Sequence, residues 1–251
     1  MSGSLVVGSR AVRRVGLVGH GRIGRIVAAA VAAGEAGRNE IVAILTRGRD
    51  APASARFHVA AAPFLAVPVD LYLDCAGPHA LAQHGEALLA RADLWTVSGA
   101  ALVDAGLRAR LEATGQAAGR RLRILAGAIG GLDALAAFAI RGVDAAALSI
   151  EAPEIEVATD MSLAAAARLM PDGVNVAAAA AAAAGIWDDL RVCLRPAGAA
   201  GDRVLSLNMR GPLGAFAATL RPETDPARGL HIVAASLIAA LRREDETIQV
   251  G

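Results

Sequence analysis

The stretch VGLVGHGRIG, Val15 to Gly24, decides the fold of this chain. A short apolar run ends directly at a G-x-G-x-x-G hexad, and an alanine- and valine-rich segment follows it. This order of strand, glycine loop and helix is the context that makes such a hexad informative. Gly19 permits a tight turn, Gly21 lets the backbone approach a pyrophosphate, and Gly24 lets the helix pack closely on the strand. The motif predicts a dinucleotide site, and a plain structural turn is the alternative.

Short apolar runs alternate with helix-like segments over the first half of the chain. The runs cover residues 15–18, 40–45, 69–76, 94–97 and 122–125, and the helical segments cover 22–33, 80–91 and 102–114. Strands that alternate with helices of about 10–15 residues indicate βαβ units and a parallel sheet. The stretch 48–68 contains three prolines and predicts only a short helix or strand.

The pattern changes after about residue 132. Helical segments are expected at 132–140, 161–170, 176–186 and 230–243, and strands at 147–157, 190–194, 203–210 and 215–220, with a hairpin turn at 211–214. We therefore predict an α/β protein whose Rossmann domain with a parallel sheet spans residues 1–126. A smaller α+β substrate and dimerisation domain spans 127–225, and a C-terminal helix in 226–251 packs back on the Rossmann domain.

Composition excludes several classes of function. The 251 residues carry 25 basic and 24 acidic side chains, for a net charge of +1, which argues against a nucleic-acid or membrane partner. All the basic residues are arginine, which excludes a Schiff-base lysine and a P-loop. Cys75 and Cys193 are far apart and show no metal-ligand spacing, so no metal is expected. No signal-peptide pattern or stretch of about 20 apolar residues occurs, so a cytoplasmic protein is expected.

The residues after the second apolar run bear on the choice of cofactor. An NAD site expects an acid there to accept a hydrogen bond from the ribose 2′-hydroxyl. The chain instead reads Thr46, Arg47, Gly48 and Arg49. Because guanidinium groups suit bidentate phosphate contacts, this favours NADP over NAD. The alternative is that Arg47 and Arg49 are solvated loop charges.

Several motifs resemble the L-aspartate dehydrogenase family. The segment 126–134, AGAIGGLDA, closely matches the family's SGAIGGLDA, and 98–100 matches the end of its S-x-GA strand. The segments QHG at 83–85, VNVAA at 174–178 and RGPLG at 210–214 are also similar to the family. The resemblance spans residues 15–243 and implies an NAD(P)-dependent enzyme that interconverts L-aspartate with iminosuccinate, or with oxaloacetate and ammonia. It also implies a homodimer with a small-molecule substrate.

These motifs define the expected site. The residues expected to bind the cofactor are Gly19, His20, Gly21, Arg22, Ile23, Gly24, Thr46, Arg47, Arg49, Ala76, Gly77, Ser98, Gly99 and Ala128. The residues expected to bind substrate are Gly127, Ile129, Gly130, Asn175, Arg210 and Arg228. Three alternatives stay open: the 127–131 segment as a tight crossing between domains, Asn175 as a helix cap, and both arginines as solvated charges.

The chain departs from the family where a catalytic histidine is expected. The family's N-x-H-E-I strand places that histidine at Leu205, and the hydroxyls of its NPKTS loop become Gly229 and Leu230. Leucine cannot carry a proton, so His231 and His79 are the candidate proton carriers. Two alternatives to aspartate chemistry follow: an imine reductase or amino acid dehydrogenase for a less polar substrate, and a non-catalytic NADP-binding paralogue.

Overall fold

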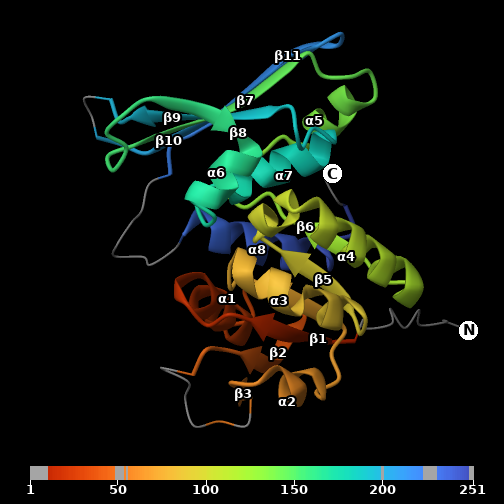
Figure 1. The fold of residues 1–251 in the computed structure, drawn as a ribbon. Helices are drawn as coiled ribbons and strands as arrows, with labels where there is room; N and C mark the ends of the chain where they lie inside the picture. The colour runs from red at the N-terminus through yellow and green to blue at the C-terminus, as the bar shows by residue number, and fades with distance from the viewer. Residues whose placement is uncertain (1–10, 49–53, 55, 199–200, 223–230, 249–251) are drawn as a thin grey trace, which may run out of the picture.

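The computed structural model describes residues 11–48, 54, 56–198, 201–222 and 231–248. Its strands form one sheet of six strands and one of five, with helices around the first and between the two (Figure 1). The predicted α/β fold, a Rossmann-type domain followed by a smaller domain, is confirmed. The division at residues 126 and 225 stays a prediction.

The first sheet is parallel throughout. Its strands are β1 (Arg13–Val18), β2 (Asn39–Leu45), β3 (Phe57–His58), β4 (Leu71–Asp74), β5 (Asp93–Thr96) and β6 (Leu122–Ile124). Their spatial order is β3-β2-β1-β4-β5-β6. The chain therefore reverses its direction of winding between β1 and β4. Ligands of open α/β sheets bind at such a switch point, beyond the carboxyl ends of the strands.

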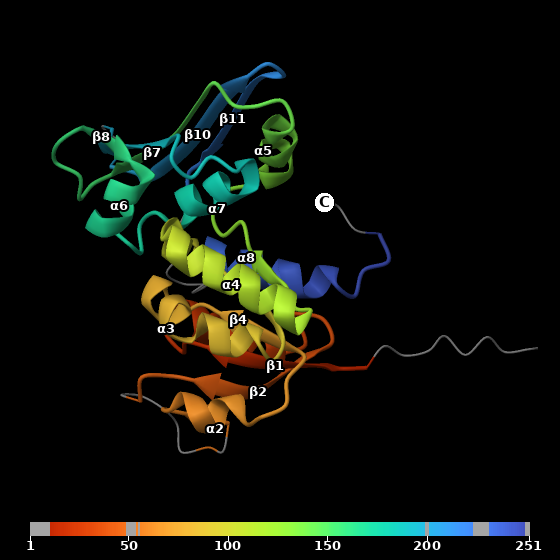
Figure 2. The same ribbon diagram turned by 45° about the vertical axis from the view of Figure 1, so that its right-hand side comes forward.

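Helices cover both faces of this sheet. They are α1 (Arg22–Ala32), α2 (Ala61–Leu65), α3 (Pro78–Leu89), the 3-10 helix η1 (Gly99–Val103), α4 (Ala105–Ala118) and α8 (Ile232–Arg243). Helix α8, from the far end of the chain, packs beside α1 (Figures 1 and 2). Its Leu237 and Leu241 share a core with Val15, Leu17 and Val27. The carboxyl-terminal segment thus completes the first domain.

The second sheet is mixed and carries helices on one face. Its strands are β7 (Ala145–Ala152), β8 (Thr159–Ser162), β9 (Leu190–Pro196), β10 (Val204–Gly211) and β11 (Gly214–Leu220), in the order β11-β10-β7-β9-β8. Only β7 and β9 pair in parallel. The helices are α5 (Leu132–Ala139), α6 (Leu163–Leu169) and α7 (Asn175–Ala184), and they lie between this sheet and the first domain (Figure 2).

Two segments of the second domain differ from the sequence prediction. The stretch 161–170 was expected to be one helix, but its first residues belong to β8, which pairs with β9. Helix α6 begins only after Ser162, whose hydroxyl accepts a hydrogen bond from the Ala165 N–H at 3.2 Å. The strand expected at 147–157 ends at Ala152, because Pro153 has no N–H to donate to a ladder. Local pairing and capping decide both boundaries.

One further property concerns membranes. Among the residues that the structure describes, no helix is long and apolar enough to cross a bilayer.

Candidate functional site

The glycine loop connects β1 to α1 at the switch point. Gly19 has a φ of +96°, in the left-handed region that favours glycine, and a Cβ placed on it would lie 2.8 Å from the Cα of Ala76. A Cβ on Gly24 would overlap the carbonyl oxygen of Gly19. These two glycines are therefore required by the turn and by the close packing of α1 on it. The loop has the geometry that the sequence predicted.

Gly21 is different, because a Cβ on it would meet no atom within 4 Å among the described residues. The first turn of α1 holds no acidic residue, and no described side chain caps it. The backbone N–H groups of that turn are therefore available to an anion. An open, uncapped loop of this shape fits the pyrophosphate of a dinucleotide.

The turns after β4 and β5 lie at the same edge of the sheet. Ala76 and Gly77 follow β4, and the contact between Gly19 and Ala76 joins this turn to the glycine loop. Ser98 and Gly99 follow β5, where the Ser98 N–H donates to the Thr96 hydroxyl at 2.8 Å. The structure thus brings together these four predicted cofactor residues and the loop.

Asp74, the last residue of β4, is a site residue that sequence reasoning missed. Its carboxylate is fully buried and accepts hydrogen bonds from the Thr96 hydroxyl at 2.7 Å and the Ala76 N–H at 3.0 Å. Burial raises the pKa of Asp74, and the hydrogen bonds from Thr96 and Ala76 partly oppose that rise. The carboxylate therefore fixes the turns after β4 and β5, which border the candidate cofactor site. An acid that closes a buried apolar strand was the available signal.

The end of β2 lies beside the glycine loop, because the Gly19 N–H donates to the Leu45 carbonyl at 2.8 Å. Thr46 follows, and its N–H donates to the His58 carbonyl at 2.9 Å. Arg47 is exposed at this edge. His20, in the loop, packs edge-on against Phe57 at 4.9 Å between ring centroids. Arg49 lies outside the described residues.

The glycine-rich segment 126–131 links β6 to α5 and so crosses from one domain to the other. Gly127 has a φ of +62° and Gly131 a φ of +84°, and a Cβ on Gly131 would overlap the ring of Phe216. Ile129 is 3% exposed in the core of the second domain, with Ala128 packed against that core. Gly130 is exposed. The segment is a tight crossing, and its contact with a nicotinamide and substrate stays a prediction.

Asn175, the first residue of α7, joins the two domains. Its Oδ1 accepts a hydrogen bond from the Ala100 N–H at 3.0 Å, and its Nδ2 donates to the Asp172 carbonyl at 3.2 Å. No side chain of the described residues caps the N-terminus of α7. The amide therefore positions α7 against the turn after β5, and its role toward a substrate stays a prediction.

The two candidate histidines lie at different places along the sheet edge. His79 is exposed at the second position of α3, directly after Gly77 and the carboxyl end of β4. His231 precedes α8, and its Nδ1 accepts a hydrogen bond from the Val233 N–H at 3.3 Å. Its Nε2 lies 3.4 Å from a guanidinium nitrogen of Arg22 in the glycine loop. Burial, and then the charge of Arg22, lower the pKa of His231.

Leu205 occupies an apolar face. Along β10 the side chains of Leu205, Leu207 and Met209 are buried toward the helices. The strand partners of Leu205 are Ile150 on β7 and Leu220 on β11. No polar side chain stands beside Leu205 on the neighbouring described strands to replace the histidine expected from the family.

Of the two predicted substrate-binding arginines, the structure describes only Arg210. Arg210 is exposed and alternates with the buried residues of β10, so its side chain projects from the opposite face to Leu205. Arg228 lies outside the described residues. The structure thus places the glycine loop and the turns after β4 and β5 at one edge of the sheet, and Arg210 does not lie there.

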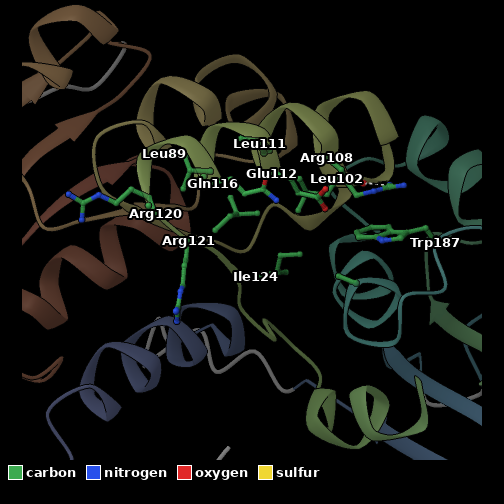
Figure 3. Close-up of a pocket in the computed structure, with 14 residues that line it drawn as sticks. Leu89, Leu102, Arg108, Leu111, Glu112, Gln116, Arg120, Arg121, Ile124 and Trp187 are labelled. Carbon is green, nitrogen blue, oxygen red and sulfur yellow. Dashed lines mark hydrogen bonds between the residues drawn. The ribbon is translucent and has the colours of Figure 1, made fainter. Parts of the chain in front are cut away.

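Two cavities in the described part of the chain lie away from the glycine loop. The larger, about 600 Å³, lies between α4, β6 and Trp187 (Figure 3). Within it the guanidinium of Arg108 stacks on Trp187 at 4.3 Å from the ring centroid. The smaller, about 500 Å³, includes Arg210 and opens on the outer face of the second sheet. In the described residues, no group of three or more His, Cys, Asp or Glu could hold a metal ion.

Comparison with known proteins agrees with this geometry. Residues 19–125 match the sequence model of the homoserine dehydrogenase NAD-binding domain. The L-aspartate dehydrogenase of Ruegeria pomeroyi is 34% identical to this chain over 94% of both. This chain belongs to the L-aspartate dehydrogenase family. L-aspartate dehydrogenase 2 of Bordetella bronchiseptica is 32% identical over 95% of this chain and 99% of its own length.

The fold of this chain agrees with that of a solved structure. The aspartate dehydrogenase of Thermotoga maritima superposes with a TM-score of 0.77, covering 95% of this chain and 99% of that one, at 20% identity. The resemblance inferred from the 126–134 segment is thereby confirmed at the level of family and fold.

Proposed function

We propose that this protein is an NAD(P)-dependent amino acid dehydrogenase that acts at a CH–NH2 carbon, with L-aspartate as substrate. The observation that carries the proposal is the open, uncapped glycine loop at the switch point of a family member. In this reaction L-aspartate loses a hydride to the oxidised cofactor and a proton to the protein or solvent. The iminosuccinate formed is hydrolysed to oxaloacetate and ammonia.

Residues of this chain bind the cofactor and the substrate and move the proton in this reaction. The N–H groups at the start of α1 bind the phosphates, and the turns at Ala76 and Ser98 support the ring that accepts or donates the hydride. The buried carboxylate of Asp74 holds these turns in place through its hydrogen bonds from Ala76 and Thr96. Asn175 and the crossing segment 127–131 border the substrate. His79, exposed at the sheet edge, is one candidate for moving the proton, and His231 is the other.

A second candidate function rests on Leu205. Aspartate carries two carboxylates, and burying either beside Leu205, Ile150 and Leu220 would leave it unpaired at a large cost. An amino acid or imine with an apolar side chain suits that surface. The second proposal is therefore an amino acid dehydrogenase or imine reductase of the same fold for a less polar substrate.

The deciding experiment is reductive amination. Oxidation of NADPH and NADH is followed with oxaloacetate and excess ammonium at alkaline pH, and L-aspartate is identified by chiral chromatography. The same assay with 2-oxo acids that carry apolar side chains tests the second proposal, and omission of ammonium is the control. Turnover with oxaloacetate supports aspartate chemistry. Cofactor binding without turnover of any 2-oxo acid contradicts both proposals and favours a non-catalytic NADP-binding protein.

NADP is the proposed cofactor in preference to NAD. Arg47 is exposed beyond β2, and none of the described residues next to it supplies the acid that a ribose 2′-hydroxyl would require. Its guanidinium suits a 2′-phosphate. The ratio of NADPH to NADH affinity tests this preference.

We also propose a cytoplasmic homodimer. The outer face of the second sheet carries no helix among the described residues (Figure 2). Small side chains such as Ala147, Ser149 and Ala217 lie along it. A sheet face without a covering helix suits a second copy of the same sheet. Light scattering after gel filtration tests the dimer, and a monomer at micromolar concentration contradicts it. Cell fractionation tests the location.

A further inference from the structure

Arg22 and His231 meet although they are 209 residues apart in the chain. Arg22 is the first residue of α1, and His231 directly precedes α8, which packs along α1. We propose that these two side chains together bind the pyrophosphate of the dinucleotide, and this rests on the proposed cofactor binding. The proposal gives His231 a binding role and leaves His79 as the candidate proton carrier.

The argument rests on which nitrogen carries hydrogen. A neutral imidazole has one N–H and one acceptor nitrogen. The Nδ1 of His231 accepts from the Val233 N–H at 3.3 Å, which places the hydrogen on Nε2. The guanidinium of Arg22 has donors only. At 3.4 Å from His231 Nε2, it therefore places one hydrogen-bond donor next to another. An anionic oxygen that accepts from both groups resolves this conflict.

Charge supports the same assignment. Among the described residues, Arg22 is the charged group that acts on the pKa of His231, and with burial it lowers that pKa. Arg25, one turn further along α1, acts instead on His20. A bound phosphate would oppose both effects and favour the protonated imidazole. Phosphate binding and protonation of His231 should therefore be linked.

The pyrophosphate fits this position better than the 2′-phosphate does. Arg22 follows Gly21 directly, where the backbone is open and α1 begins. The 2′-phosphate is expected beyond β2, near Arg47. A contact at Arg22 and His231 should therefore serve NADH and NADPH equally.

The test measures binding first, and turnover of the same variants second. Dissociation constants of NADH and NADPH are obtained by titration calorimetry for the wild type, His231→Asn and Arg22→Gln. Asparagine can still cap α8, so His231→Asn removes the phosphate contact while keeping the helix start. Arg25→Gln is the matched control, because it removes the same charge from the same helix. His231→Gln provides a second replacement.

We expect about 10-fold weaker binding of both dinucleotides in His231→Asn and Arg22→Gln, as for loss of a charge-assisted hydrogen bond. Arg25→Gln should change either affinity less than about 2-fold. The loss in the double variant should be smaller than the product of the single losses. Nitrogen NMR of the wild type with inorganic pyrophosphate should show the His231 imidazole titrating at higher pH than in the free protein.

Three outcomes overturn the proposal. Unchanged affinities in His231→Asn, with normal binding by the wild type, remove His231 from the phosphate site. A loss confined to NADPH assigns the contact to the 2′-phosphate instead. A loss of turnover at unchanged affinity makes His231 a proton carrier. Failure of the wild type to bind either dinucleotide would refute the proposed function itself, which is a distinguishable result.

Discussion

The edge of the first sheet and the inner face of the second sheet contrast sharply. The edge holds glycines that the turn requires, an uncapped helix start and a buried carboxylate, Asp74, with two hydrogen-bond donors. On the inner face, the described strand partners of Leu205 are the apolar residues Ile150 and Leu220. Both regions belong to one family fold, yet among the described residues only the first gathers hydrogen-bonded polar groups around its turns.

We infer from this difference that cofactor binding and substrate chemistry are separable in this fold. The cofactor edge depends mainly on backbone N–H groups and glycine geometry, which many side-chain changes leave intact. The substrate face depends on individual side chains, so a single replacement such as leucine for histidine changes what it can do. The predictions below test each side of this contrast.

The largest effect is expected at Gly24. In Gly24→Ala the new Cβ overlaps the Gly19 carbonyl, so the loop must shift. We expect about 3 kcal/mol of destabilisation and about 100-fold weaker dinucleotide binding, measured by urea unfolding and calorimetry. Gly21→Ala is the control, because its Cβ meets no described atom. It should weaken binding without loss of stability, and equal stability losses would contradict this account of the loop.

The substrate face is tested by Leu205→His. A histidine among Ile150 and Leu220 should lower the free energy of unfolding by about 1–3 kcal/mol, because its ring nitrogens would be buried without partners. It should also raise aspartate-forming turnover by about 100-fold if a proton carrier is what the face lacks. Leu205→Gln is the control, since it adds polarity without a group that titrates near neutrality. A similar rise in both variants would contradict a proton-transfer role.

Asp74 predicts a dependence of stability on pH. Burial raises the pKa of this carboxyl above its value in the unfolded chain. The contribution of Asp74 to the free energy of unfolding is therefore fully present below about pH 4. It is lost as the pH rises through the pKa of the folded state. Asp74→Asn should remove this loss, so the free energy of unfolding of the wild type should fall relative to that of the variant as the pH rises. Urea unfolding at several pH values measures this difference.

Asp104 provides the control of opposite sign. The backbone N–H groups of Leu107 and then Gly106 lower its pKa, so its contribution is present at neutral pH and lost on acidification. The wild type should therefore lose stability relative to Asp104→Asn as the pH is lowered. If Asp74→Asn behaved like Asp104→Asn, the buried carboxyl would have a lowered pKa instead.

The smallest effect is expected at Arg47. Because Arg47 is exposed, Arg47→Ala should weaken NADPH binding by about 5-fold and leave NADH binding unchanged. Calorimetry with both cofactors measures this difference. Unchanged NADPH affinity in Arg47→Ala, and also in Arg49→Ala, would show that the loop charges are solvated and that NADP is not preferred.

Much of the fold was readable from the chain. The strand, glycine loop and helix around Gly19 to Gly24 were predicted because the local sequence carries the turn chemistry and the apolar periodicity together. The boundary near Ser162 was missed, because a strand pairing with β9 and a capping hydroxyl overrode the helical preference of the alanines that follow. Such pairings join segments that are distant in the sequence.

The site was only partly predictable for the same reason. The cofactor residues cluster in turns after strands, and parallel strands necessarily bring those turns to one edge. The contact between Arg22 and His231, and the use of Asn175 to join α7 to Ala100, depend on how distant elements pack. No local pattern encodes them.

The sequence by itself determined the parallel sheet and the glycine loop at its switch point, and its resemblance to the family predicted the replacement of the family histidine by Leu205. Only the tertiary structure decided that Leu205 faces Ile150 and Leu220, that Arg210 projects from the other face, and that Asp74 is fully buried. The physical reason is that periodicity and turn preferences act between near neighbours along the chain. Burial and donor–acceptor pairing depend instead on which distant segments share a core.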